Sequence, residues 1–100
     1  MPRAMAKENK QWRARLLDAF VSMESKKEMG DFLLDLCTPA ELAAFEERFE
    51  IARMLQDTER PYRDIAERTG ASTTTVARVA RFLRQENNKG YRLALQRIKK

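Results

Sequence analysis

The sequence contains no histidine and a single cysteine, Cys37, among its 100 residues. One cysteine cannot form an intrachain disulfide, and without histidine a structural zinc site is disfavoured. The absence of histidine also removes the commonest general acid and base, and the sequence has neither a glycine-rich phosphate loop nor a nucleophile elbow. We therefore expect no metal, no cofactor and no enzymatic activity.

Long apolar runs are missing too. No segment approaches the roughly 20 apolar residues that cross a bilayer, and no signal-peptide pattern is present, so we expect a soluble, cytoplasmic protein without membrane contact. No segment alternates with a period of two over the length of a strand. The sequence thus predicts an all-α fold, with residues 1–100 as one domain whose small core would gain stability from a partner subunit.

Charged residues are abundant but unevenly distributed. Residues 1–57 contain 9 Lys/Arg against 11 Asp/Glu, whereas residues 58–100 contain 11 against 4, which gives net charges of −2 and +7. A basic helical surface can serve solubility alone. Here, however, the positive part also contains the one motif that would benefit from attraction to phosphates.

That motif is a helix-turn-helix pattern between residues 61 and 84. Gly70 can adopt the positive φ that ends a first helix, and Ser72 or Thr73 can cap a second. A small core would close between the helices, formed by Ile65, Ala66, Ala71, Val76 and Val79. The hydrogen-bond donors left outside, which we predict to contact DNA, are Arg63, Ser72, Thr73, Thr74, Thr75, Arg78 and Arg81.

Two of these features have simpler interpretations. Arg78 could be a surface arginine paired with a carboxylate such as Glu67, and the hydroxyl run at residues 72–75 could be only a helix cap. We favour DNA contact for both, because the motif places Arg78 near the groove and four hydroxyls exceed what one cap needs.

The N-terminal segment has a strong helical period from about Asn9, with apolar residues at Trp12, Leu16, Phe20 and Met23. Residues 1–8 lack a capping signal and are predicted to be a flexible arm. The apolar face must be buried against something, and the residues alone leave open whether that is the intrachain core or a dimer interface.

Capping signals define the remaining helices. Ser25 and Glu28 form a capping box before a helix at 26–37, and Thr38-Pro39 starts a third that ends near Gln56. The third helix should bury Leu42, Phe45, Phe49, Ile51, Ala52 and Leu55. Pro61 should start the fourth helix, and Asn87 or Asn88 should cap a sixth that carries Tyr91, Leu95 and Ile98.

Residues 38–87 resemble the tryptophan repressor family from its third helix to the end of its reading head, without a gap. The matching stretch is TPAELAAFEERFEIARMLQDTERPYRDIAERTGASTTTVARVARFLRQEN. The likeness is closer still to the TrpR-related YerC/YecD group, which shares the Thr-Pro helix start and the Ser-Thr-Thr-Thr run. Upstream, Gln11-Trp12 and Leu16-Leu17 resemble the repressor's first helix.

The resemblance implies a six-helix, intertwined homodimer in which residues 9–56 and 88–100 interlock between subunits. Two helix-turn-helix reading heads, residues 61–84 of each subunit, would then enter successive major grooves of double-stranded DNA. It thus favours the dimer interface for the N-terminal apolar face. It also implies a sequence-specific transcriptional regulator, with repression the expected outcome.

The ligand pocket is where the sequence departs from the tryptophan repressor. The resemblance makes Arg48 and Arg78 the arginines that flank the bound indole, with Thr38 at another pocket position. The repressor's glycine and serine are replaced by Val79 and Phe82, which would fill the indole site, so we expect no tryptophan corepressor and identify no other effector. For Arg48 we favour pairing with a carboxylate on another helix or subunit over ligand binding.

Another class of function remains open from the sequence. The chain could be a helical adaptor for an acidic protein partner, or a DNA-binding subunit of a larger assembly such as a replication or transposition complex. A steep salt dependence of DNA binding would distinguish a DNA-binding protein from a protein-only adaptor.

Overall fold

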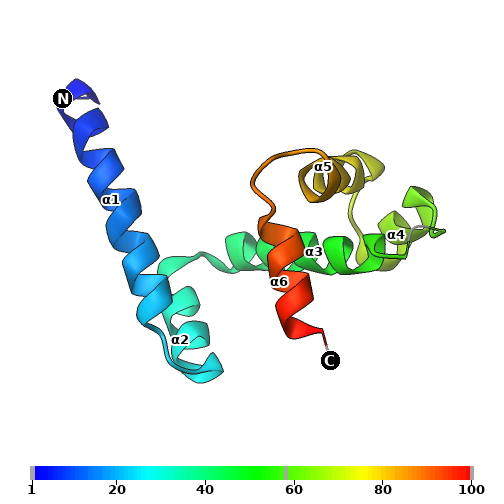
Figure 1. Cartoon of the computed structure of the whole chain (residues 1–100), viewed down its shortest axis with the longest axis horizontal. Helices are drawn as coiled ribbons and strands as arrows, with labels where there is room; N and C mark the ends of the chain where they lie inside the picture. The colour runs from blue at the N-terminus through cyan, green and yellow to red at the C-terminus, as the bar shows by residue number, and fades with distance from the viewer. Residues whose placement is uncertain (1, 58, 100) are drawn as a thin grey trace. The chain divides into compact units, whose positions relative to one another are not determined.

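The computed structural model describes residues 2–57 and 59–99, with side chains described from residue 11 onward. These residues form six α-helices and no strand, so the predicted all-α, six-helix fold class is confirmed (Figure 1). The helices are α1 (Pro2–Ser22), α2 (Lys26–Leu36), α3 (Pro39–Leu55), α4 (Tyr62–Thr69), α5 (Thr73–Arg84) and α6 (Gly90–Ile98). The chain divides into two compact units, Met1–Pro39 and Ala40–Lys100.

The first unit contains α1 and α2. Helix α1 begins at Pro2, seven residues before the predicted start at Asn9, since proline suits the first helical position and the residues that follow are mostly good helix formers. The backbone of the predicted arm at residues 1–8 is therefore helical from Pro2, while its side chains lie outside the described residues.

Helix α2 begins as its sequence predicts. The Ser25 hydroxyl accepts a hydrogen bond from the Glu28 backbone N–H at 3.1 Å, and the Glu28 carboxylate accepts one from the Glu24 N–H at 2.8 Å. The helix ends at Leu36, where the backbone N–H of the half-buried Cys37 donates to the carbonyl of Leu33. At the helix start, the Ser25 side chain thus satisfies one of the unpaired backbone donors of α2, while Glu28 binds the residue before the cap.

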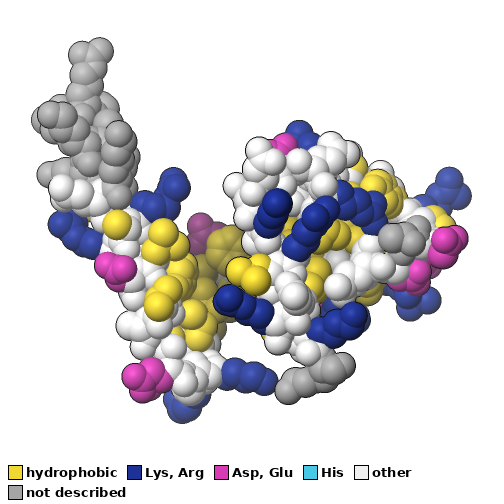
Figure 2. Space-filling view, viewed as in Figure 1, with side chains coloured by type: hydrophobic (Ala, Val, Ile, Leu, Met, Phe, Trp, Pro, Cys, Tyr) yellow, Lys and Arg dark blue, Asp and Glu magenta, His cyan; other side chains and the backbone are white. Residues whose placement is uncertain are grey.

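The first unit leaves most of its apolar surface open. The rings of Phe20 and Phe32 meet edge to face with centroids 5.6 Å apart, yet no residue between 11 and 39 is fully buried. Trp12 is 46% exposed, Val21 84% and Leu34 68%. Figure 2 shows the hydrophobic side chains following one side of this unit. Two helices alone cannot cover an apolar face of this width.

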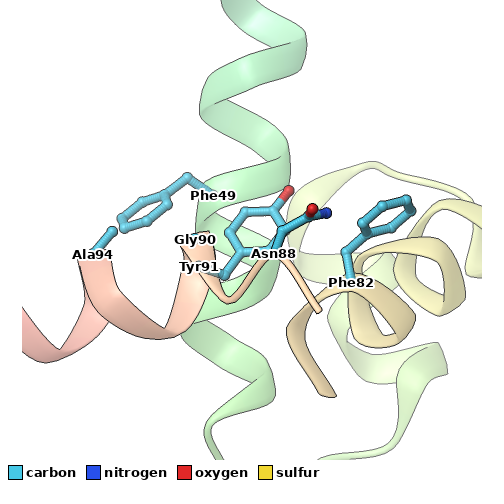
Figure 3. A pocket seen from close by; sticks show the side chains of 6 residues that line it. All are labelled: Phe49, Phe82, Asn88, Gly90, Tyr91 and Ala94. Atoms are coloured by element: carbon cyan, nitrogen blue, oxygen red, sulfur yellow. The ribbon is translucent and has the colours of Figure 1, made fainter. Parts of the chain in front are cut away.

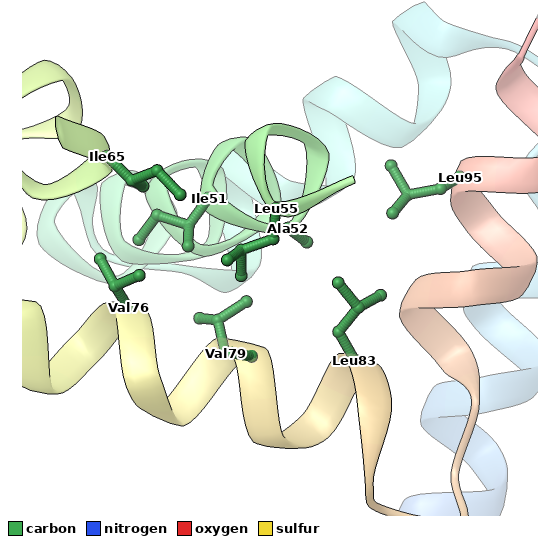
Figure 4. Close-up of a cluster of buried hydrophobic side chains, with 9 residues drawn as sticks. Ile51, Ala52, Leu55, Ile65, Val76, Val79, Leu83 and Leu95 are labelled. Carbon is green, nitrogen blue, oxygen red and sulfur yellow. The ribbon is translucent and has the colours of Figure 1, made fainter. Parts of the chain in front are cut away.

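The second unit is built around one compact core to which all four of its helices contribute. On α5 the buried positions recur at the helical spacing of three and four residues, which turns one side of the helix inward. Figure 4 shows Val76 and Val79 pointing from α5 toward the buried side chains of α3. The fully buried residues are Ile51, Ala52, Leu55, Ile65, Val76, Val79, Ala80, Leu83 and Leu95.

The predicted core of the helix-turn-helix is confirmed, with Ala66 and Ala71 half-buried against it. The predicted buried face of α3 is confirmed at Ile51, Ala52 and Leu55, while Leu42 and Phe49 are half-buried and Phe49 packs against the core. Phe45 is 49% exposed, so its predicted burial is not met within one chain.

The turn between α4 and α5 forms as predicted. Gly70 has a φ of 81°, and its N–H donates to the Ala66 carbonyl at 2.9 Å, which closes the last turn of α4. The Thr69 hydroxyl donates to the Ile65 carbonyl and accepts from the Ala71 N–H. Ser72 is the N-cap of α5. Three residues thus connect the two helices, and the start of α5 is exposed.

Two predicted helix starts were wrong. Pro61 is the N-cap of α4 rather than its first residue, and α6 follows Lys89, which has a φ of 60°, rather than Asn87 or Asn88. A side chain of α6 itself holds this helix against the end of α5. Arg92 donates to the carbonyls of Leu83 and Arg84 at the end of α5, at 2.8 and 3.2 Å.

Candidate nucleic-acid interface

The four hydroxyls at the start of α5 fall into two pairs. The Ser72 hydroxyl accepts from the Thr75 backbone N–H at 3.1 Å and lies 3.1 Å from the Thr75 hydroxyl, so these two residues form the helix cap. Thr73 and Thr74 are exposed, and their hydroxyls make no hydrogen bond within the described residues. The capping interpretation therefore accounts for half of the run and leaves two hydroxyls facing solvent.

Arg78 lies on the same exposed side, one helical turn beyond Thr74. Its guanidinium carbon is 4.5 Å from the centroid of the Phe82 ring, a distance typical of a cation–π contact. Within the described part of the chain it contacts no carboxylate, and the alternative pairing with Glu67 does not occur. A cation without a counter-ion thus sits on the outer side of α5.

Arg81 has a different environment, although the sequence grouped it with Arg78. Its guanidinium carbon lies 5.0 Å from the centroid of the same Phe82 ring, and its Nε is 3.6 Å from a carboxylate oxygen of Glu86. Part of its charge is therefore balanced within the chain.

Arg63, the remaining predicted contact, is exposed on α4 beside a shallow surface depression of about 430 Å³. Its neighbour Asp64 is already paired with Arg60 at 2.8 Å and with Arg68 at 3.2 Å. Arg63 itself has no carboxylate partner among the residues whose side chains are described.

Several other arginines of the positive segment have structural contacts, which sequence reasoning missed. Arg84 donates to the carbonyl of Leu55, the last residue of α3, at 2.8 Å, and also to the Tyr62 hydroxyl at 3.4 Å. Arg92 caps α5 in the same way. Each arginine binds the end of a different helix from its own, so no local sequence signal could have identified these contacts.

Positively charged side chains also lie close together on the surface of the second unit. Figure 2 shows Lys and Arg side chains gathered on the side of the second unit that carries α5.

On α3, Arg53 hydrogen-bonds Glu50 and thereby holds the pKa of that carboxyl below its usual value of 4.5.

The five residues predicted to correspond to the repressor's ligand pocket have separate environments. Val79 is fully buried in the core, and Arg48 is half-buried with its guanidinium carbon 5.9 Å from the centroid of the Phe45 ring. The favoured carboxylate partner of Arg48 is not among the contacts of the described residues. Thr38 is exposed directly before α3. Arg78 and Phe82 contact each other on the outer side of α5.

Phe82 also borders an apolar cavity of about 330 Å³ that opens between α3, α5 and α6 (Figure 3). Phe49 reaches it from α3 and Tyr91 and Ala94 from α6, while Asn88 and Gly90 complete the lining. None of these lining side chains is charged.

The described residues contain neither a metal site nor a membrane-spanning helix. They contain no group of three or more metal-ligating side chains that could hold a metal ion. None of the described helices has the length and apolarity needed to span a bilayer.

Comparison with known proteins gives consistent matches over most of the chain. A family model described as Trp repressor protein matches residues 10–99. The uncharacterized protein YerC of Bacillus subtilis (strain 168) is 39% identical over 85 residues, which are 85% of this chain and 80% of that protein.

Two solved structures are similar in both fold and sequence. One is a TrpR-like protein from Eubacterium eligens ATCC 27750, with a TM-score of 0.80, 42% identity and coverage of 87% of this chain and 88% of that one. The other, from Staphylococcus aureus, has a TM-score of 0.79, 33% identity and coverage of 87% and 85%.

Proposed function

Because the chain belongs to the Trp repressor protein family, which is regulatory rather than enzymatic, we propose that it is a sequence-specific DNA-binding transcriptional repressor. The helix-turn-helix of α4 and α5 would place the exposed side of α5 in the major groove. The observation that carries this proposal is the division of α5 into a buried apolar side and an exposed side, on which Thr73, Thr74 and Arg78 have no hydrogen-bond or ion-pair partner among the described residues.

The order of groups along that exposed side supports a groove contact. Thr74, Arg78 and Arg81 follow one another at i, i+4 and i+7, so they share one face of the helix. Short hydroxyls at the helix start can approach base edges and phosphates, and arginine further along can bind guanine or phosphate. The first turn contains no acidic residue that would repel the DNA backbone.

We further propose that the protein acts as a homodimer. The apolar face of α1 and α2 is largely exposed within one chain, and a second copy that covers it would be related by twofold symmetry. The two α5 helices would then read half-sites about 34 Å apart, which requires a palindromic operator.

Tryptophan is not expected to be the corepressor. Val79 is fully buried where the tryptophan repressor has glycine, and the Phe82 ring contacts the Arg78 guanidinium. A ligand that required the space of Val79 would have to displace part of the core. Isothermal titration calorimetry with L-tryptophan should show no binding, and micromolar affinity would contradict this part of the proposal.

The decisive experiment is selection from a random duplex library with the purified protein, followed by titration of the selected DNA at several salt concentrations. We expect a palindrome that outcompetes random duplex by at least about a thousandfold. If about six phosphates are neutralised per dimer, log K should fall against log salt with a slope of roughly −5.

A comparison of two arginine variants would show whether DNA contacts α5 in particular. Arg78→Ala should weaken binding and reduce the salt slope, whereas Arg97→Ala, which removes an exposed charge from the last turn of α6, should change both less. Recovery of no motif and no salt dependence would refute the proposal and favour a protein-only adaptor. DNA binding without a palindrome would favour a subunit of a larger assembly.

A further inference from the structure

The outer side of α5 carries a three-residue group that neither the charge pattern nor the helix-turn-helix motif explains. The guanidinium carbons of Arg78 and Arg81 lie 4.5 and 5.0 Å from the centroid of the Phe82 ring. Arg78 is four residues before Phe82, so the helical register itself brings the two side chains together. Phe82 is half-buried, and it lines the apolar cavity together with Phe49 and Tyr91.

The two arginines are not equivalent in this group. Arg81 is held by two contacts, the ring and the Glu86 carboxylate at 3.6 Å, whereas Arg78 has only the ring among the described contacts. Without the ring, the long Arg78 side chain would sample many rotamers. Ordering it on binding would then cost conformational entropy.

We infer that Phe82 is a positioning residue that holds the Arg78 guanidinium in place before DNA arrives. The inference rests on the proposed DNA-binding function and deepens it. Phe82 acts through Arg78 rather than by touching DNA, because it is half-buried and borders the cavity formed with Phe49 and Tyr91. A guanidinium stacked on a ring keeps its edge N–H groups free to donate to a phosphate or base.

The test is a double-mutant cycle on the selected operator with Phe82→Leu, Arg78→Ala and the double variant. Phe82→Leu retains an apolar side chain but removes the aromatic face, and it should weaken DNA binding by about two- to fivefold. In the Arg78→Ala background the same substitution should change the affinity by less than a factor of about 1.5. Phe82→Tyr, which keeps the ring, should bind as the unsubstituted protein does.

A second measurement needs no DNA and so separates this inference from the proposed function. In the NMR spectrum of the free protein, the Arg78 side-chain protons should be shifted upfield by the Phe82 ring current. The shift should persist in Phe82→Tyr and vanish in Phe82→Leu. Phe82→Met, an unbranched replacement, serves the same purpose if the leucine variant does not fold.

The outcomes are distinct. A protein that shows the ring-current shift but binds no DNA would refute the proposed function while leaving the stacking intact. Equal costs of Phe82→Leu in both arginine backgrounds would show a merely structural role and overturn the inference. Absence of the shift in the unsubstituted protein would overturn it as well.

Discussion

At the scale of single residues, the hydroxyl run at the start of α5 separates stability from recognition. Ser72→Ala removes the acceptor for the Thr75 N–H, so it should lower the free energy of unfolding by about 1 kcal/mol. The Thr74 hydroxyl makes no hydrogen bond within the described residues, so Thr74→Ala should leave stability within about 0.5 kcal/mol. Its effect should instead be a roughly two- to tenfold rise in the Kd for DNA, the loss expected for one hydrogen bond.

Urea unfolding and fluorescence anisotropy on the selected operator would measure the two effects side by side. We expect Ser72→Ala to change the free energy of unfolding and Thr74→Ala to change the affinity for DNA. Equal destabilisation by both substitutions would mean that Thr74 also belongs to the cap.

Lys89, just before α6, has a backbone conformation that can be tested by substitution. It has a left-handed backbone, with a φ of 60°, which costs a side-chain-bearing residue about 1 kcal/mol or more. Glycine removes that strain but loses about 0.5–1 kcal/mol through its freer unfolded chain. Lys89→Gly should therefore stabilise the protein by about 0.5 kcal/mol and raise Tm by roughly 2–4 °C.

The matched control is Lys99→Gly, which removes the same charge at a residue with a φ of −69°. It should not stabilise the protein, because glycine there relieves no strain. If differential scanning calorimetry showed the same Tm gain for both variants, charge rather than backbone conformation would be the cause.

At the scale of helices, the arginines of α5 divide between packing and the exposed surface. Arg84 binds the end of α3 through the Leu55 carbonyl, so Arg84→Ala should lower the free energy of unfolding by about 1–2 kcal/mol. Arg78→Ala should leave stability within about 0.5 kcal/mol. If Arg78 contacts one phosphate, its removal should also make the slope of log K against log salt less negative by about 1.

Both substitutions remove one positive charge from the same helix, so general electrostatics cannot produce opposite patterns. A salt slope changed equally by the two variants would mean that Arg84 reaches DNA as well. That result would contradict its assignment as a cap of α3.

The helices also show which features are readable from sequence. Gly70 and Ser72 mark the turn because their effects are local: one permits a positive φ and the other caps the next helix. The Arg84 contact joins residues 29 apart, and no local pattern encodes it. The same holds for the start of α6, where Arg92 binds the end of α5 and Lys89 accepts a conformation that lysine does not favour.

For the candidate interface, the sequence likewise predicted which residues take part but not their contacts. The composition identified the hydroxyls and arginines of α5, but not which of them the cap or Glu86 would engage. Phe82 was noted only as a bulky replacement in a ligand pocket. Its role as a platform for Arg78 depends on side-chain geometry, which spacing of four residues permits but does not require.

At the scale of the whole molecule, the exposed apolar face of the first unit bears on oligomeric state. Val21 and Leu34 are so exposed within one chain that a glutamate at either position would lower the stability of a monomer only slightly. In a dimer that buries this face, the same glutamate would place a charge inside the interface. Val21→Glu and Leu34→Glu should therefore shift the protein toward monomer and lower its Tm.

The control is Gln11→Glu, which adds one charge on the polar side of α1, where the side chain contacts Arg15. Analytical ultracentrifugation over a range of protein concentrations would follow the equilibrium. The unsubstituted protein and the control should sediment as dimers with a concentration-dependent Tm, because folding is then coupled to association. If the unsubstituted protein were monomeric at tens of micromolar, or if Val21→Glu stayed dimeric, the apolar face would not be the interface. The twofold operator would then lose its physical basis.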